Sequence, residues 1–143
     1  MSILLDTNLM VFAFRPELPE HERTRRWMGE ALAGSEELAL TSLAATGFLR
    51  IVTNRRIFGD PAGTRESLGF LRELRRSPTV RSIEPAKRHR HLFEGLCTSL
   101  DLQGDDIPDA HLAALAIEHD AGLATHDRGF DRFPGLRTFD PLA

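Results

Sequence analysis

The chain has 143 residues, of which 41% are hydrophobic and 27% charged, and its formal net charge is −3. This size and composition are typical of one ordinary globular domain, and the negative balance argues against a general nucleic-acid binder, which usually carries a basic excess. No segment approaches the roughly 20 apolar residues that span a bilayer, and no signal-peptide pattern is present, so we expect a cytoplasmic protein with one domain over residues 1–143. Cys97 is the only cysteine, which excludes an intrachain disulfide.

Hydrophobic periodicity predicts alternating strands and helices along the chain. The first strand runs from Ser2 to Asp6, and Thr7 and Asn8 begin the turn that leaves it. Ser42 can cap the second helix. After the first strand, the predicted elements are a helix over 21–33, a strand over 37–41, a helix over 42–54, a helix over 63–76, a strand over 80–83, a helix over 86–100, a helix over 108–119, a strand over 122–125 and an extended segment over 136–139.

This alternation predicts an α/β fold, in which helices cover both faces of a mostly parallel sheet. Ligands of such sheets bind beyond the carboxyl ends of the strands. Three aspartates occupy matching positions, because Asp6 closes the first strand, Asp127 follows the strand over 122–125, and Asp109 lies at a helix start. Clustered carboxylates repel one another unless a hard cation is bound, so the pattern predicts a site for Mg²⁺ or Mn²⁺.

Each aspartate also has a local explanation that involves no ligand. Asp6 suits a turn after a strand, Asp109 suits the positive end of a helix dipole, and Asp127 suits a loop before Gly129. Only the joint placement of the three favours a metal site. The histidines beside them, at positions 111 and 126, are interpreted as neighbours of the site and not as its base.

Positive charge is clustered although the sum is negative. The clusters are Arg23/Arg25/Arg26, Arg50/Arg55/Arg56, Arg72/Arg75/Arg76 and the run from Lys87 to His91. Taken singly, each is typical of a solvated helix face. Taken together they favour a polyanionic substrate, with Arg50 and Arg55 near the mouth of the predicted site as candidates for steering phosphates.

Four segments carry a more specific pattern: Leu4-Leu5-Asp6-Thr7-Asn8, Gly47 to Asn54, Asp109 to Ala116, and Thr125 to Phe130. In order and spacing they resemble a PIN-domain ribonuclease of the VapC toxin type over nearly the full chain. The tail, Phe133 to Leu136 followed by Asp140 to Leu142, is similar to a mycobacterial-type subgroup of these toxins.

The resemblance implies a parallel sheet in the order 3-2-1-4-5, metal-dependent cleavage of RNA, a homodimer and neutralisation by a VapB-type antitoxin. Carried over by position, Asp6, Asp109 and Asp127 match acidic metal ligands of the family. Asn8 matches a polar position that orients a carboxylate or a water, and the Thr125 hydroxyl matches one that holds the acidic loop in place. The implied chemistry is hydrolysis of a phosphodiester by a water that the metal ion activates.

Two positions depart from the family pattern. Gly47 stands where these nucleases commonly have a glutamate, so Asp105, Asp106 or Glu22 would have to supply the missing carboxylate. Gly129 stands where relatives often carry another acid, with Asp131 as a candidate substitute.

Two other classes of protein stay open, the first because Gly47 replaces an expected ligand and the second because it also uses an aspartate after a parallel strand. One is a noncatalytic acidic domain that binds RNA or a protein, and the other is an aspartyl-phosphate phosphatase or receiver-like domain, which would form a covalent phosphoryl-enzyme. The second is disfavoured because no aspartate stands two residues after Asp6 and no lysine lies near the late strand. The apolar residues over 48–58 and 63–76 are further interpreted as a dimer interface or an antitoxin groove.

Overall fold

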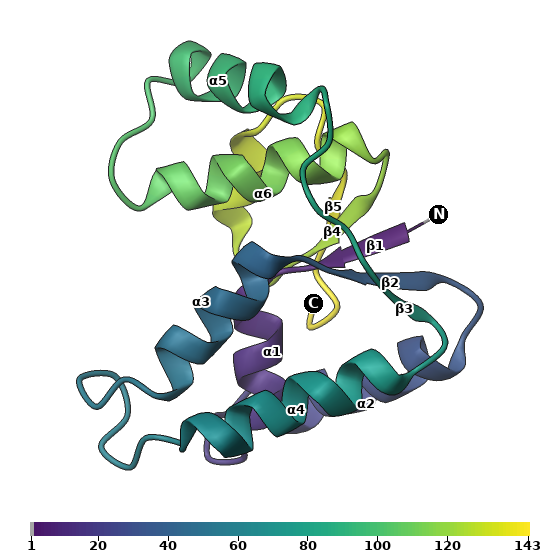
Figure 1. Ribbon diagram of the computed structural model, residues 1–143, viewed down its shortest axis with the longest axis vertical. Helices are drawn as coiled ribbons and strands as arrows, with labels where there is room; N and C mark the ends of the chain where they lie inside the picture. The colour runs from purple at the N-terminus through teal and green to yellow at the C-terminus, as the bar shows by residue number, and fades with distance from the viewer. Residues whose placement is uncertain (1) are drawn as a thin grey trace.

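The computed structural model describes residues 2–143, and its centre is a five-stranded parallel sheet in the order β3-β2-β1-β4-β5 (Figure 1). This confirms the predicted α/β class and strand order. In the central strand, Leu4 pairs with Ala39 on one side and with Leu123 on the other. The strands are β1 (Ser2–Leu5), β2 (Glu37–Leu40), β3 (Val80–Ser82), β4 (Gly122–Ala124) and β5 (Thr138–Phe139).

Helices cover both faces of the sheet. Figure 1 shows α5 and α6 above the sheet and α1 to α4 on the opposite face. Their bounds are α1 (Thr7–Phe14), α2 (His21–Ala33), α3 (Ser42–Val52), α4 (Thr64–Arg76), α5 (His89–Ser99) and α6 (Asp106–Glu118), and a short 3₁₀ helix, η1 (Arg128–Arg132), follows β4. Among residues 2–143, no helix has both the length and the hydropathy to cross a membrane.

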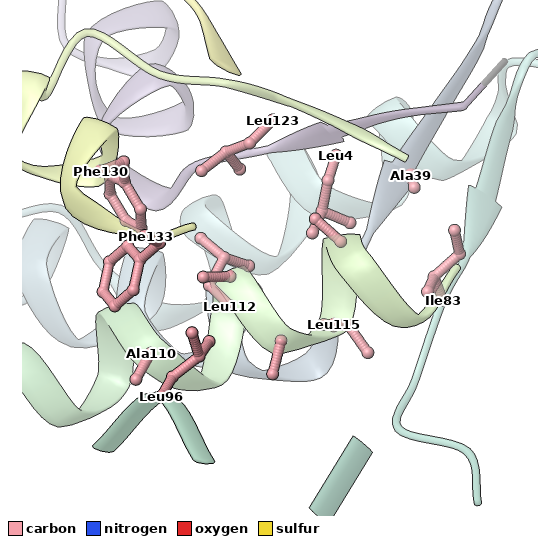
Figure 2. Close-up of a cluster of buried hydrophobic side chains, with 13 residues drawn as sticks. Leu4, Ala39, Ile83, Leu96, Ala110, Leu112, Leu115, Leu123, Phe130 and Phe133 are labelled. Carbon is pink, nitrogen blue, oxygen red and sulfur yellow. The ribbon is translucent and has the colours of Figure 1, made fainter. Parts of the chain in front are cut away.

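The alternation of side chains along β1 supplies both hydrophobic cores. Leu4 points toward α6, where it meets Leu115 and the strand neighbour Leu123 in the core drawn in Figure 2. Leu5, the next residue, belongs to the second core, which α1, α3 and α4 complete with residues such as Phe48. All five of these side chains are fully buried. A strand that is apolar on both faces is what a central parallel strand requires.

The predicted turn at Thr7 and Asn8 is wrong, because both residues belong to helix α1. Asp6 is extended and occupies the N-cap position, and the helix then buries Leu9, Met10 and Val11 in succession. An apolar run without an amphipathic stripe does not show helical periodicity in the sequence. The first crossover therefore contains α1 as well as the predicted helix α2.

Several boundaries also differ from the prediction. The N-cap of α3 is Thr41 and not Ser42, since the buried Thr41 hydroxyl accepts a hydrogen bond of 3.0 Å from the Ala44 N–H. Helix α5 begins at His89, three residues after the predicted start, and α6 begins at Asp106, two residues before it. The 3₁₀ helix was not predicted, because five residues are too few to show a period.

Candidate active site

A cleft of about 440 Å³ opens beyond the carboxyl ends of β1 and β4, between α3 and α6. Four of the residues that line it are aspartates: Asp6, Asp105, Asp109 and Asp127. The three aspartates singled out in the sequence thus share one cavity, although about a hundred residues of chain separate Asp6 from Asp109. This is the edge of a parallel sheet where ligand sites are expected.

Asp6 is the most deeply placed of these carboxylates, with 6% of its surface exposed. The backbone N–H of Asp6 donates to the Ala124 carbonyl across the end of the sheet, and its Oδ2 accepts a hydrogen bond of 2.7 Å from Thr125 Oγ1. Burial is the main cause that raises the pKa of Asp6 to about 6; the Thr125 hydrogen bond opposes the rise, and the charges of Asp109 and Asp127 add to it. The fold therefore holds a carboxylate where its ionised form is disfavoured.

Thr125 connects the first and the last of the three aspartates. The same Oγ1 that donates to Asp6 accepts a hydrogen bond of 3.0 Å from the backbone N–H of Asp127. Asp127 then caps η1, because its Oδ1 accepts a bond of 2.8 Å from the Gly129 N–H. The hydroxyl thus links the Asp6 carboxylate to the start of the acidic loop.

Asp109 enters the cleft from the first turn of α6 and is half-buried. Burial raises the pKa of its carboxyl above the usual value, the Arg132 guanidinium opposes the rise, and Asp127 and Asp106 add to it. Arg132 Nη2 lies 3.1 Å from Asp106 Oδ1 and 3.5 Å from Asp109 Oδ2. Sequence reasoning missed Arg132, since an arginine in a polar segment has no distinguishing pattern.

The other residues that the sequence predicts for the site lie partly in the cleft and partly around it. Asn8, Arg50 and Asp105 line the cleft, and all three are exposed. Arg55 lies in the turn after α3, outside the lining. Asp106 is not a lining residue, because its carboxylate is paired with Arg132 instead.

Two further acids considered as substitute ligands lie elsewhere. Glu22 is on the exposed side of α2, with its Oε1 3.9 Å from Arg25. Asp131 accepts a hydrogen bond of 2.9 Å from Thr138 and lines a separate hollow beside β5. Neither residue faces the cleft, so Asp105 is the one proposed substitute that does.

At Gly47, where the resemblance leads us to expect a glutamate, a neighbouring helix restricts the space for a side chain. A Cβ atom on Gly47 would lie 3.1 Å from Thr7 Oγ1 and 3.2 Å from Thr7 Cγ2. The Thr7 hydroxyl also faces α3, where it donates to the Ala44 carbonyl at 3.3 Å. Helices α1 and α3 therefore approach so closely that Thr7 occupies the space that a side chain at position 47 would need.

Neither histidine beside the site acids lines the cleft. The ring of His111 lies beneath α5, with its centroid 4.3 Å from that of His89, while His126 Nδ1 lies 2.9 Å from Asp140 Oδ2. Both rings thus make these contacts outside the lining of the cleft.

The donors in the cleft fit a hard divalent cation, since they are oxygen atoms and the ionised form of Asp6 is disfavoured without a positive partner. Within residues 2–143, no three His, Cys, Asp or Glu side chains already stand close enough together to form a metal-binding group. The carboxylates thus share a cavity without being drawn into a closed set of ligands.

Comparison with known proteins places the chain in a family. The model of the PIN domain matches residues 3–136. Ribonuclease VapC43 of Mycobacterium tuberculosis is 37% identical over 140 residues, covering 98% of this chain and 95% of the relative, and ribonuclease VapC31 of the same organism is 37% identical over 138 residues, covering 96% and 97%.

Solved structures share the fold. The crystal structure of VapBC2 from Rickettsia felis bound to a promoter DNA fragment matches with a TM-score of 0.75 at 20% identity, covering 98% of both chains. Mycobacterium tuberculosis VapC20, described as a sarcin-ricin loop cleaving toxin, matches with a TM-score of 0.66 at 16% identity, covering 94% of this chain and 98% of that one. The chain therefore belongs to the PIN-domain family and, within it, to the VapC ribonucleases.

Proposed function

We propose that this protein is a metal-dependent endoribonuclease toxin in which Asp6, Asp109 and Asp127 hold a Mg²⁺ or Mn²⁺ ion. The observation that carries the proposal is the opening of these three carboxylates, from three distant elements, into one cleft. The family adds the substrate class, because the relatives at 37% identity are named ribonucleases. We further propose that it acts in the cytoplasm, as the sequence predicts.

Residues in and beside the cleft have separate roles in the proposed hydrolysis. A bound divalent ion supplies a Lewis acid that offsets charge building on the scissile phosphate. Thr125 orients Asp6 through the 2.7 Å hydrogen bond and fixes the start of the Asp127 loop. Arg50, on the α3 wall of the cleft, is placed to attract a phosphate of the RNA backbone, and Arg55 continues the positive charge along the turn that follows α3.

We propose a VapB-type antitoxin and a second copy of this chain as protein partners. Several solved structures that share the fold are structures of VapBC. Most apolar residues of α3 and α4 pack into the core, but Ile57 remains 51% exposed and Leu68 36% exposed. These two side chains lie in the segments from which the sequence predicts a partner surface, and covering them would remove apolar area from water.

Purified protein and a mixed RNA substrate test the catalytic proposal. Cleavage is expected with Mn²⁺ or Mg²⁺ and not with EDTA, and Asp6→Asn, Asp109→Asn and Asp127→Asn are each expected to lower the rate by at least about 100-fold, because each removes a charge that binds the ion. Asp131→Asn is the matched control, since it makes the same chemical change outside the cleft and should retain the wild-type rate. Binding of RNA without cleavage by the wild type would instead identify a noncatalytic domain.

A further inference from the structure

Arg132 is a cation held at the edge of an acidic cleft. Its Nη2 contacts Asp106 and Asp109, its Nη1 donates to the Gly129 carbonyl, and its Cζ lies 4.5 Å from the centre of the Phe133 ring. Phe133 is itself buried in the core of α6. The guanidinium is thus fixed by two carboxylates, a carbonyl and an aromatic face, although a third of the side chain remains exposed.

Gly129 lies close to both the Arg132 guanidinium and the Asp127 carboxylate. A Cβ atom at that position would lie 2.8 Å from Arg132 Nη1 and 3.0 Å from Asp127 Oδ1. Any side chain there would displace the guanidinium or the Asp127 carboxylate. Glycine at this position leaves room for both groups as the structure places them.

The charge balance of the cleft follows from these contacts. Arg132 engages Asp106 and the Oδ2 of Asp109, which lie on the η1 side of the α6 start. Asp6 and Asp127 carry no contact with Arg132 and face the cleft. A second divalent ion between Asp106 and Asp109 would have to take the place of the guanidinium or stand beside its positive charge.

We propose that Arg132 is a resident cation that takes the place of a second metal ion: it positions Asp109 and restricts the cleft to one divalent ion. This inference rests on the proposed metal-dependent function. Arg132 does not touch the reacting atoms in this scheme. It acts through Asp109 and Asp106, and its fixed fork supplies positive charge without using a metal ion.

Titration with Mn²⁺, followed by calorimetry and by the electron paramagnetic resonance signal of free Mn²⁺, tests the inference directly. The wild type is expected to bind one ion per chain. Arg132→Met keeps a long side chain against Phe133 but removes the charge, and it is expected to bind two. Arg132→Lys retains the charge and is expected to remain at one ion.

Arg137→Met is the matched control, because it makes the same change at an arginine whose Nη1 pairs with Asp120 outside the cleft, and it should bind one ion. Two ions in the wild type, or one ion in Arg132→Met at the wild-type affinity, would overturn the role of Arg132 and leave the metal-dependent function standing. No ion in the wild type would overturn the metal-dependent function itself. Two ions in the wild type would overturn the inference whether or not the variants fold.

Discussion

Asp6 is the residue at which stability and function oppose each other most clearly. The side chain is buried at the end of the central strand, and burial is the first cause that raises its pKa from 3.8 to about 6. At neutral pH the folded protein must keep this group ionised in a poorly solvated place, next to two more carboxylates. A cation would remove that penalty, so the same residue that destabilises the free protein would bind the ion.

The sign of the pH dependence follows from this raised pKa. Below pH 3.8 the Asp6 carboxyl is protonated in both the folded and the unfolded protein. As pH rises from 3.8 to about 6, the carboxyl ionises more readily in the unfolded protein. The free energy of unfolding therefore falls, by about 3 kcal/mol in total. We therefore expect Asp6→Asn in EDTA to be more stable than the wild type near neutral pH. The advantage should vanish toward pH 4, and urea unfolding at a series of pH values measures it.

Asp131→Asn serves as the control in this series, because Asp131 is exposed and the change should produce no comparable advantage. Added Mn²⁺ should stabilise the wild type and leave Asp6→Asn nearly unchanged. If Asp6→Asn were less stable than the wild type at every pH, the destabilisation that we assign to the buried, ionised carboxylate would be wrong.

Single residues also show where sequence reasoning stops. Asp6, Asp109 and Asp127 could be predicted to converge, because strand ends and helix starts of a parallel sheet meet at one edge. Arg132 could not, since its contacts depend on the path of η1 past the start of α6. The sequence offers Asp106 as a candidate ligand, but its pairing with Arg132 depends on side-chain direction, which spacing does not encode.

At the scale of elements, the close approach of α1 and α3 shapes the cleft wall. Thr7 begins α1 and Gly47 lies in the middle of α3, and the missing Cβ of the glycine leaves room for the threonine side chain. In an isolated helix, glycine costs about 1 kcal/mol relative to alanine. The contact with Thr7 is a structural reason for glycine at this position despite its low helix propensity.

A double-mutant cycle tests this contact. Gly47→Ala in the wild-type background should gain little or no stability, because its Cβ would lie 3.1 Å from Thr7 Oγ1. In the Thr7→Ala background the same change should raise the free energy of unfolding by about 1 kcal/mol, the usual gain of helix propensity. Urea unfolding of the four proteins gives the coupling. Equal effects of Gly47→Ala in both backgrounds would show that the two helices do not restrict each other here.

Elements with a clear amphipathic or alternating pattern could be predicted, and the others could not. The predicted bounds of α2 and α4 agree with the structure nearly to the residue, because one face of each helix is buried and the other is charged. Helix α1 was missed because Leu9, Met10 and Val11 are buried around most of its circumference, which removes the period. The five residues of η1 are shorter than any window in which a period can be read.

The whole molecule separates its charges although its net charge is only −3. Acidic residues gather at the carboxyl edge of the sheet, and Arg50 and Arg55 lie on α3 and on the turn that follows it. The Asn54 side chain orders this turn, since its Oδ1 accepts a hydrogen bond of 2.8 Å from the Arg56 N–H. An RNA strand that enters the acidic cleft would thus meet Arg50 in its wall and pass Arg55 and Arg56 on the adjoining turn.

A second group of three arginines provides the comparison. Arg72, Arg75 and Arg76 are exposed in the last turns of α4, which leads into β3. Because a helix that precedes a parallel strand ends near the amino edge of the sheet, this group lies away from the cleft (Figure 1). The two groups carry equal charge and differ in position, so replacing each in turn separates a directed RNA contact from a general effect of net charge.

We expect Arg50→Gln/Arg55→Gln/Arg56→Gln, made in the inactive Asp6→Asn protein, to weaken the binding of single-stranded RNA. The slope of log affinity against log salt should become shallower by about 2, because each lost phosphate contact removes about 0.7 from the slope. The triple change at Arg72, Arg75 and Arg76 should leave the slope nearly unaltered. Fluorescence anisotropy with a labelled oligonucleotide at several salt concentrations measures both. Equal losses in the two triple variants would mean that RNA responds to net charge alone, and that the α3 wall does not guide the strand toward the carboxylates.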